Sequence, residues 1–230
     1  MKFLVLQHIN IEHPGIFLKF MKEDNIKIDT VELDENEKIP NLDPYDAMIV
    51  MGGPMDTWQE ESYPWLKAEK EAIHKFACIN KKPFLGLCLG AQLLSEALGG
   101  KVRKMKTPEI GVLKVSVTDN KFLFKGLDKD LKVLQWHSYE VHDLPTNTNL
   151  LASSPECKGQ AFSFDKAFGL QFHVEQTNKT VPEWACVPEY KSALEKTLGE
   201  NALEKFKKDV EQNLNLFNNS AKIIYERRQY

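Results

Sequence analysis

The stretch Pro83-Phe84-Leu85-Gly86-Leu87-Cys88-Leu89-Gly90-Ala91-Gln92 joins a short apolar strand to a helix through Gly-x-Cys-x-Gly. This is the pattern of a nucleophile elbow, with Cys where the related hydrolase motif has Ser. So sharp a turn requires small residues two positions to either side, and Gly86 and Gly90 meet that requirement. Cys88 is therefore a candidate catalytic thiol. The alternative is a small buried core residue, which a lone cysteine after an apolar run usually is.

Composition excludes several classes of function. The chain has 230 residues and a formal net charge of −3, so electrostatics predict neither a nucleic-acid nor a membrane partner. No apolar run is long enough to span a membrane, and Met1–Leu6 leads directly into polar Gln7 and His8 where a signal peptide would continue apolar. We expect a cytoplasmic protein.

The cysteines and histidines show no ligand spacing. Neither a Cys-x-x-Cys pair nor a His-Glu-x-x-His cluster occurs, which predicts reduced thiols, no metal site and no cofactor. The four cysteines are Cys78, Cys88, Cys157 and Cys186.

Short apolar runs alternate with helical periodicity in the first hundred residues, which predicts a mostly parallel sheet with crossover helices. We expect an open, three-layer, flavodoxin-like α/β fold. Its predicted strands are 3–6, 28–33, 47–51 and 84–87, and its predicted helices are 14–23, 63–80 and the one that Gly99-Gly100 ends.

The second half of the chain has a different pattern. Closely spaced strand-like segments at 111–117, 131–136, 149–152, 160–164 and 168–172 predict antiparallel additions, with a hairpin around Asp165-Lys166. Two amphipathic helices follow. We expect a single domain over 1–230, with a minimal core at about 1–180 and a helical extension at about 182–230.

A base for the thiol is predicted at the end of the segment Gly169–Glu175. Residues two apart on a strand project to the same side, so His173 and Glu175 are expected to lie together. The carboxylate would then orient the imidazole for Cys88, as in related triads. Taken alone, His-x-Glu is weak evidence and more often marks a structural histidine hydrogen-bonded to the backbone at a strand end.

Gly52-Gly53-Pro54 closes the third predicted strand and would border the same crevice as the elbow. The N–H groups of Gly53 and Leu89 are candidates to stabilise an oxyanion. The helix that starts at Leu89 also favours the Cys88 thiolate through its dipole.

Taken together, these three motifs, in this order and spacing, resemble the class I glutamine amidotransferases over roughly residues 45 to 177. The resemblance implies a Cys88, His173 and Glu175 triad with oxyanion donors at Gly53 and Leu89. Gln92 matches a position that contacts substrate glutamine, and Gln135–Tyr139 looks like the loop that holds its α-amino and carboxylate groups. The substrate-binding residues so implied are Gly52, Gln92, His137, Ser138 and Tyr139.

Further segments are similar to the stand-alone, GMP-synthase-like members, a group similar to plant γ-glutamyl peptidases. These segments are Gln7-His8, Glu12–Gly15, Val50–Met55, Pro108–Gly111 and Gln135–His137. His8 and His13 have two interpretations, either at the mouth of the pocket or in a structural role at a helix entry.

The resemblance implies hydrolysis of glutamine to glutamate and ammonia through a γ-glutamyl thioester. No ATP-pyrophosphatase loop occurs in the chain, so a separate synthetase partner is one expectation. The main alternative is a γ-glutamyl peptide hydrolase without a synthetase. Two further alternatives are a redox or protease-like protein resembling DJ-1 and an inactive regulatory subunit.

Overall fold

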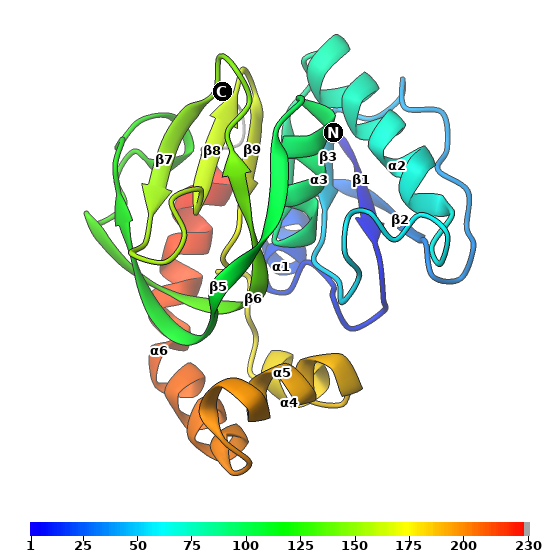
Figure 1. Ribbon diagram of the computed structural model, residues 1–230. Helices are drawn as coiled ribbons and strands as arrows, with labels where there is room; N and C mark the ends of the chain where they lie inside the picture. The colour runs from blue at the N-terminus through cyan, green and yellow to red at the C-terminus, as the bar shows by residue number, and fades with distance from the viewer. Residues whose placement is uncertain (228–230) are drawn as a thin grey trace.

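A computed structural model describes residues 1–227, and at its centre is one sheet of nine strands (Figure 1). The strands lie in the order β2-β1-β3-β4-β9-β8-β7-β5-β6. Their bounds are β1 Lys2–Gln7, β2 Lys27–Glu32, β3 Ala47–Val50, β4 Phe84–Leu87, β5 Lys101–Val117, β6 Asp130–Asp143, β7 Asn149–Ser153, β8 Ala161–Phe164 and β9 Ala167–Leu170.

Five neighbouring strands, β2, β1, β3, β4 and β9, run parallel. Their carboxyl ends therefore meet at one edge of the sheet, where ligands bind in open α/β folds. The chain reaches this edge at His8 after β1, at Gly52 after β3, at Cys88 after β4 and at His173 after β9. The predicted parallel half of the fold is confirmed.

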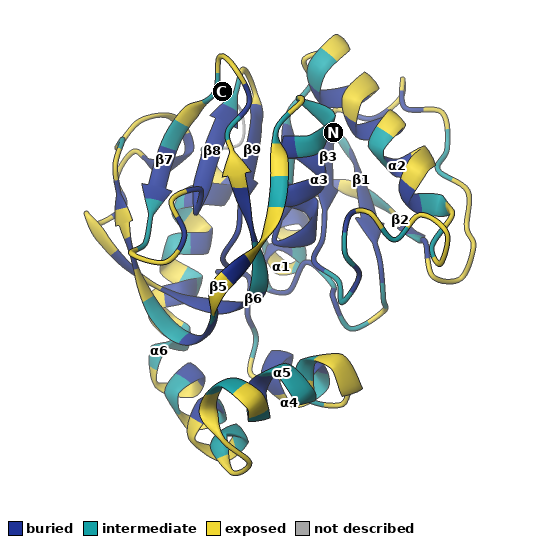
Figure 2. Cartoon of the chain, viewed as in Figure 1, coloured by how far each residue is buried: buried dark blue, intermediate teal, exposed yellow. Residues whose placement is uncertain are grey.

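Helices cover both faces of this parallel half, and side chains alternate between the faces. On β1, Phe3 and Val5 join one core cluster with α1 and α6, whereas Leu4 and Leu6 join a second cluster with α2 and α3. Figure 2 shows the central strands buried and the outer helix surfaces exposed. The helices are α1 Ile16–Glu23, α2 Trp65–Ile73, α3 Leu89–Ala97, α4 Thr180–Trp184, α5 Pro188–Leu198 and α6 Ala202–Glu226, with a π-helical turn η1 at His74–Ile79 and a 3₁₀ turn η2 at Phe122–Phe124.

The remaining strands, β8, β7, β5 and β6, are joined by antiparallel pairs, as expected. The hairpin is also confirmed, since Phe164 pairs with Ala167 across Asp165, which has φ 48°. β5 and β6 are much longer than predicted. Both continue into polar, half-exposed sequence, where a register shift between Lys104 and Glu109 interrupts the alternation of side chains.

The C-terminal extension contains three helices within the described residues, not the two predicted. The break comes at Val187, which has extended backbone (φ −80°, ψ 121°) because a residue before proline disfavours the helical conformation. α6 then runs from a cluster containing Phe206 and Val210 to the face covered by α1, where it buries Ala221. None of the helices within residues 1–227 combines the length and apolar character that crossing a membrane requires.

Candidate active site

Cys88 lies in a strained turn between β4 and α3. Its backbone has φ 50° and ψ −105°, a region that non-glycine residues seldom adopt and that costs about 1–3 kcal/mol. Its N–H donates to the carbonyl of Leu170 at 2.8 Å, which fixes the turn against β9. A Cβ at Gly86 would overlap the Gly90 carbonyl, and a Cβ at Gly90 would overlap the carbonyl of Val50. The predicted elbow is present, and its glycines are needed for space.

His173 follows β9 and is held in place by a two-way backbone bridge to β6. Its N–H donates to the Leu134 carbonyl at 2.9 Å, and its carbonyl accepts from Leu134 N–H at 3.1 Å. Nδ1 of the imidazole lies 2.6 Å from Oε1 of Glu175. The other carboxylate oxygen, Oε2, accepts from the Val174 N–H at 2.9 Å. His173 and Glu175 thus lie together, as the alternation of the strand predicts.

The third member of this group is Cys88, whose side chain is close enough to the His173 ring to interact with it through a hydrogen bond and through charge. Burial lowers the pKa of His173, but the charges of Glu175 and Cys88 and their hydrogen bonds to the ring outweigh it and raise that pKa well above its usual value. The site therefore favours the protonated imidazole of His173, which lies between Glu175 and Cys88. An imidazolium beside a thiolate is the arrangement that activates a cysteine nucleophile.

A cavity of about 180 Å³ opens beside Cys88. Gly53 and Leu89 line it together, as expected of two groups at one sheet edge. Gly52 lies one step back from the cavity, where a Cβ would be 3.3 Å from Cε1 of His173. The remaining lining residues are Pro54, Met55, Asp56, Gln92, Trp136, His137, Ser138, Tyr139, Glu189, Tyr190 and Ala193.

Gln92, on α3, connects the cavity wall to the thiol through a residue that sequence reasoning missed. Its Nε2 donates to the Tyr139 carbonyl at 3.2 Å and to Oε1 of Gln171 at 3.1 Å. Nε2 of Gln171 in turn donates to the sulfur of Cys88 at 3.5 Å. The alternation that groups His173 with Glu175 also applies to Gln171, two residues earlier, and would have identified it.

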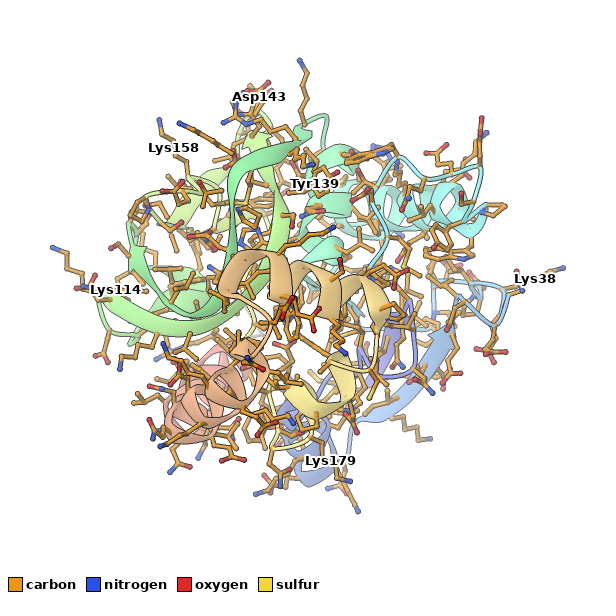
Figure 3. The ribbon with its side chains drawn as sticks, turned by 60° about the horizontal axis from the view of Figure 1, so that its bottom comes forward. Lys38, Lys114, Tyr139, Asp143, Lys158 and Lys179 are labelled. Atoms are coloured by element: carbon orange, nitrogen blue, oxygen red, sulfur yellow. The ribbon has the colours of Figure 1, made fainter. Side chains whose placement is uncertain are left out.

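The segment Gln135–Tyr139 is not a loop, as the resemblance suggested, but part of strand β6. The His137 ring lines the cavity and is held by its neighbours, with Nδ1 2.9 Å from the Tyr139 carbonyl and Nε2 3.2 Å from Oε2 of buried Glu109. Tyr139 packs against the exposed ring of Trp58, with ring centroids 4.9 Å apart. In Figure 3, turned so that the C-terminal helices come forward, Tyr139 is labelled just above them.

The C-terminal helices contribute residues that the sequence did not identify. The ring of Trp184, at the end of α4, lies 4.7 Å from that of His173 in an edge-on arrangement. Tyr190, on α5, lines the cavity, and its hydroxyl donates to Oε1 of Glu12 at 2.6 Å. Tyr190 and Glu12 are 178 positions apart in the sequence, so no local pattern pairs them.

His8 and His13 both have structural roles here. His8 is fully buried, with Nδ1 2.8 Å from the Gly52 carbonyl and Nε2 3.0 Å from Glu69, so it is not at the mouth of the cavity. His13 accepts from the Gly15 N–H at 3.0 Å at the entry of α1.

Comparison with known proteins places this geometry in a family. The family model for class-I glutamine amidotransferases matches residues 17–183. The chain belongs to the class-I glutamine amidotransferase family. Among relatives, a glutamine-hydrolyzing GMP synthase subunit of Sulfolobus acidocaldarius is 33% identical over 150 residues, which cover 64% of this chain and 77% of that protein. The glutamine amidotransferase-like protein YfeJ of Salmonella typhimurium is 30% identical over 182 residues, covering 76% of this chain and 75% of YfeJ.

Solved structures agree with this family membership. The crystal structure of a glutamine amidotransferase from Thermotoga maritima has a TM-score of 0.91 and 30% identity, covering 99% of this chain and 97% of that one. A glutamine amidotransferase from Methylobacillus flagellatus, at 24% identity, shares the fold with a TM-score of 0.87, covering 99% of this chain and 93% of that one.

Proposed function

We propose that this protein hydrolyses the γ-amide of glutamine to glutamate and ammonia, with Cys88 as nucleophile, His173 as proton carrier and Glu175 as the group that orients it. The observation that supports this most strongly is the buried His173 imidazole, held 2.6 Å from Glu175 and engaged by Cys88 beside a cavity. Glutamine is a ligand of the right kind because the family acts on γ-glutamyl amides.

In the first half-reaction the Cys88 thiolate attacks the amide carbon. A C–S bond forms, and the carbonyl electrons move to oxygen. As the tetrahedral intermediate collapses, the C–N bond breaks and the proton on Nε2 of His173 passes to the leaving nitrogen. Ammonia departs, and a γ-glutamyl thioester remains on Cys88.

In the second half-reaction His173 takes a proton from water as the water oxygen adds to the thioester carbon. The C–S bond breaks, glutamate leaves, and the thiolate is restored with the proton on His173. Glu175 keeps Nδ1 oriented throughout and stabilises the imidazolium.

The oxyanion of both intermediates is assigned to the N–H groups of Gly53 and Leu89. Both residues line the cavity with Cys88, and within residues 1–227 neither N–H donates to a backbone carbonyl. Leu89 is also the first residue of α3, so its N–H is one of those that a helix leaves free. Removing one such donor typically slows turnover by about a hundredfold or more.

Recognition of the glutamyl part is assigned to Gly52, Gln92, His137, Ser138 and Tyr139. Four of these line the cavity, while Gly52 supports the turn behind it. The Tyr139 carbonyl is already shared by Gln92 and His137, which holds this part of β6 in one conformation.

A separate synthetase partner is the further expectation. It is supported by the Sulfolobus relative, whose name describes one subunit of GMP synthase. In such a pair the ammonia released at Cys88 would be consumed by the partner.

In the test, the purified protein is incubated separately with glutamine, with glutathione and with γ-glutamyl dipeptides. The released ammonia and the released free amino acid are each measured. Ammonia from glutamine, absent in Cys88→Ala, supports the proposal. Amino acid released from peptides, without ammonia from glutamine, would identify a γ-glutamyl peptide hydrolase and overturn it. No Cys88-dependent release from any of these would indicate an inactive regulatory subunit.

A further inference from the structure

Glu12 is a buried carboxylate at the active site that the proposed mechanism does not use. Its side chain lies in the loop after β1 and is only 2% exposed. Oε1 accepts from the Tyr190 hydroxyl at 2.6 Å, whereas Oε2 has no hydrogen-bond partner among the described residues. A buried carboxylate oxygen without a partner is costly, so its surroundings need to compensate for it.

The surroundings of Gly52 identify what lies near Oε2 of Glu12. A Cβ at Gly52 would lie 2.8 Å from Oε2 of Glu12 and 3.3 Å from Cε1 of His173. The carboxylate and the Cε1 side of the imidazole therefore both border the space beside the Cα of Gly52. Glu12 thus lies near the Cε1 edge of the ring, next to the Nδ1 position that Glu175 occupies.

The charged groups around Glu12 come from several elements. The pKa of Glu12 is raised overall: burial raises it most and the charge of Glu175 adds to this, whereas the charge of His173, the Tyr190 hydrogen bond and the charge of His8 lower it. His8 is itself paired with Glu69 on α2. Around Tyr190, the facing charges are Cys88 and Glu189, and on α4 Glu183 lies 3.6 Å from His13. Of these groups, His173 is the one whose positive charge acts on Glu12 and which also contacts Glu175.

Tyr190 connects this carboxylate to α5. Burial and the nearby charges of Glu12 and Cys88 raise the pKa of Tyr190 well above its usual value, so the phenol keeps its proton and donates a hydrogen bond to Glu12. Its ring lies 5.6 Å from that of Trp136 and 6.0 Å from that of Trp184, and the latter ring packs on His173. The aromatic cluster leaves the hydroxyl little freedom to move.

Glu12 and Tyr190 both lie outside residues 17–183, the span that the family model matches. We propose that Glu12 is a positioning residue: its carboxylate, held by the Tyr190 hydroxyl, faces the protonated imidazole of His173 as a second negative charge beside Glu175, and so makes α5 part of the active site. The proposal rests on the function proposed above, because it assigns His173 its role in proton transfer.

The direct test follows the titration of the His173 ring in the substrate-free protein by NMR, with histidine labelled at Cε1 and the signal assigned through His173→Gln. Glu12→Gln keeps the shape and an oxygen for Tyr190 but removes the charge. We expect the His173 midpoint to fall by about one pH unit, the effect of losing an opposite charge at close range. Glu12→Asp should restore part of the shift. The alkaline limb of glutamine hydrolysis should move in the same direction.

Tyr190→Phe tests the connection to α5 and should lower the midpoint by less than Glu12→Gln. The matched control is Tyr45→Phe, which removes a hydroxyl also 2.6 Å from a carboxylate, that of Asp29 on β2. It should leave the titration unchanged.

An unchanged midpoint in Glu12→Gln would overturn the role of Glu12 and leave a purely structural contact. An unchanged midpoint in Tyr190→Phe would overturn the part assigned to α5. The titration needs no turnover, so an enzyme inactive on glutamine would contradict the proposed function and still leave this measurement decisive.

Discussion

Nδ1 of His173 lies 2.6 Å from Oε1 of Glu175, and both side chains are buried beneath the elbow that carries Cys88. A carboxylate this close fixes the orientation of the ring and leaves Nε2 to serve the thiol. The backbone bridge from His173 to Leu134 on β6 fixes the backbone that carries the ring. Because this pair includes a titrating histidine, the activity of the site should depend on pH.

That dependence follows from the raised pKa of His173. Burial opposes the shift, but Glu175 and Cys88 outweigh it, so the imidazolium survives above the usual histidine value of about 6.5 and is lost as pH rises through the raised pKa. We expect kcat/KM for glutamine to hold its maximum past neutral pH and to fall only in the alkaline range. An alkaline limb centred at or below the usual histidine value would contradict this.

Glu175→Gln should lower kcat by about 10⁴-fold, as replacing the orienting carboxylate does in a related triad, and should move the alkaline limb to lower pH. The control Glu204→Gln changes a carboxylate that is 82% exposed and paired with Lys207 on the helix surface, and should leave activity unchanged. Equal losses in both variants would argue against an orienting role.

The strain at Cys88 gives a prediction about stability. Because φ 50° suits glycine better than other residues, Cys88→Gly should be more stable to denaturant than Cys88→Ala by about 1 kcal/mol. Chemical unfolding of the two variants measures this directly. If the alanine variant is the more stable of the two, the elbow is not strained in the folded protein.

Gly90 is predicted to be intolerant of any side chain. A Cβ there would overlap the carbonyl of Val50, so Gly90→Ala should destabilise by about 3 kcal/mol. Gly99→Ala is the matched change, because nothing lies within 4 Å of its Cβ position and only its positive φ of 89° costs energy, about 1 kcal/mol. Equal midpoints in urea unfolding would contradict this account of the elbow.

The long helix α6 should derive its stability from one face. Phe217 is fully buried and Leu216 is 51% exposed. We expect Phe217→Ala to lower the free energy of unfolding by about 3–5 kcal/mol and Leu216→Ala by less than about 0.5 kcal/mol. A small effect at Phe217 would mean that the extension contributes little to the folded core.

The parallel half of the fold and the elbow could be predicted because their signals are local. Apolar runs such as Ala47–Val50 mark strands buried on both faces, and Gly86 with Gly90 marks the turn. The alternation of a strand is enough to group His173 with Glu175.

The parts that escaped prediction depend on contacts between distant residues. Strand β5 begins with polar residues and includes Pro108, so periodicity alone does not reveal that it pairs with β6 as far as Lys101. Glu12 and Tyr190 are separated by 178 positions, and only the packing of α5 against the site brings them together.

The central claim is that Cys88 attacks a γ-glutamyl carbonyl, and covalent labelling tests it most directly. The protein is incubated with a glutamine-like diazoketone, digested and mapped by mass spectrometry, with iodoacetamide as a control reagent for the exposed Cys186. We expect one label per chain, on Cys88, blocked by excess glutamine and absent in Cys88→Ala. Labelling of Cys78, Cys157 or Cys186 in its place, or labelling that glutamine does not protect against, would contradict it.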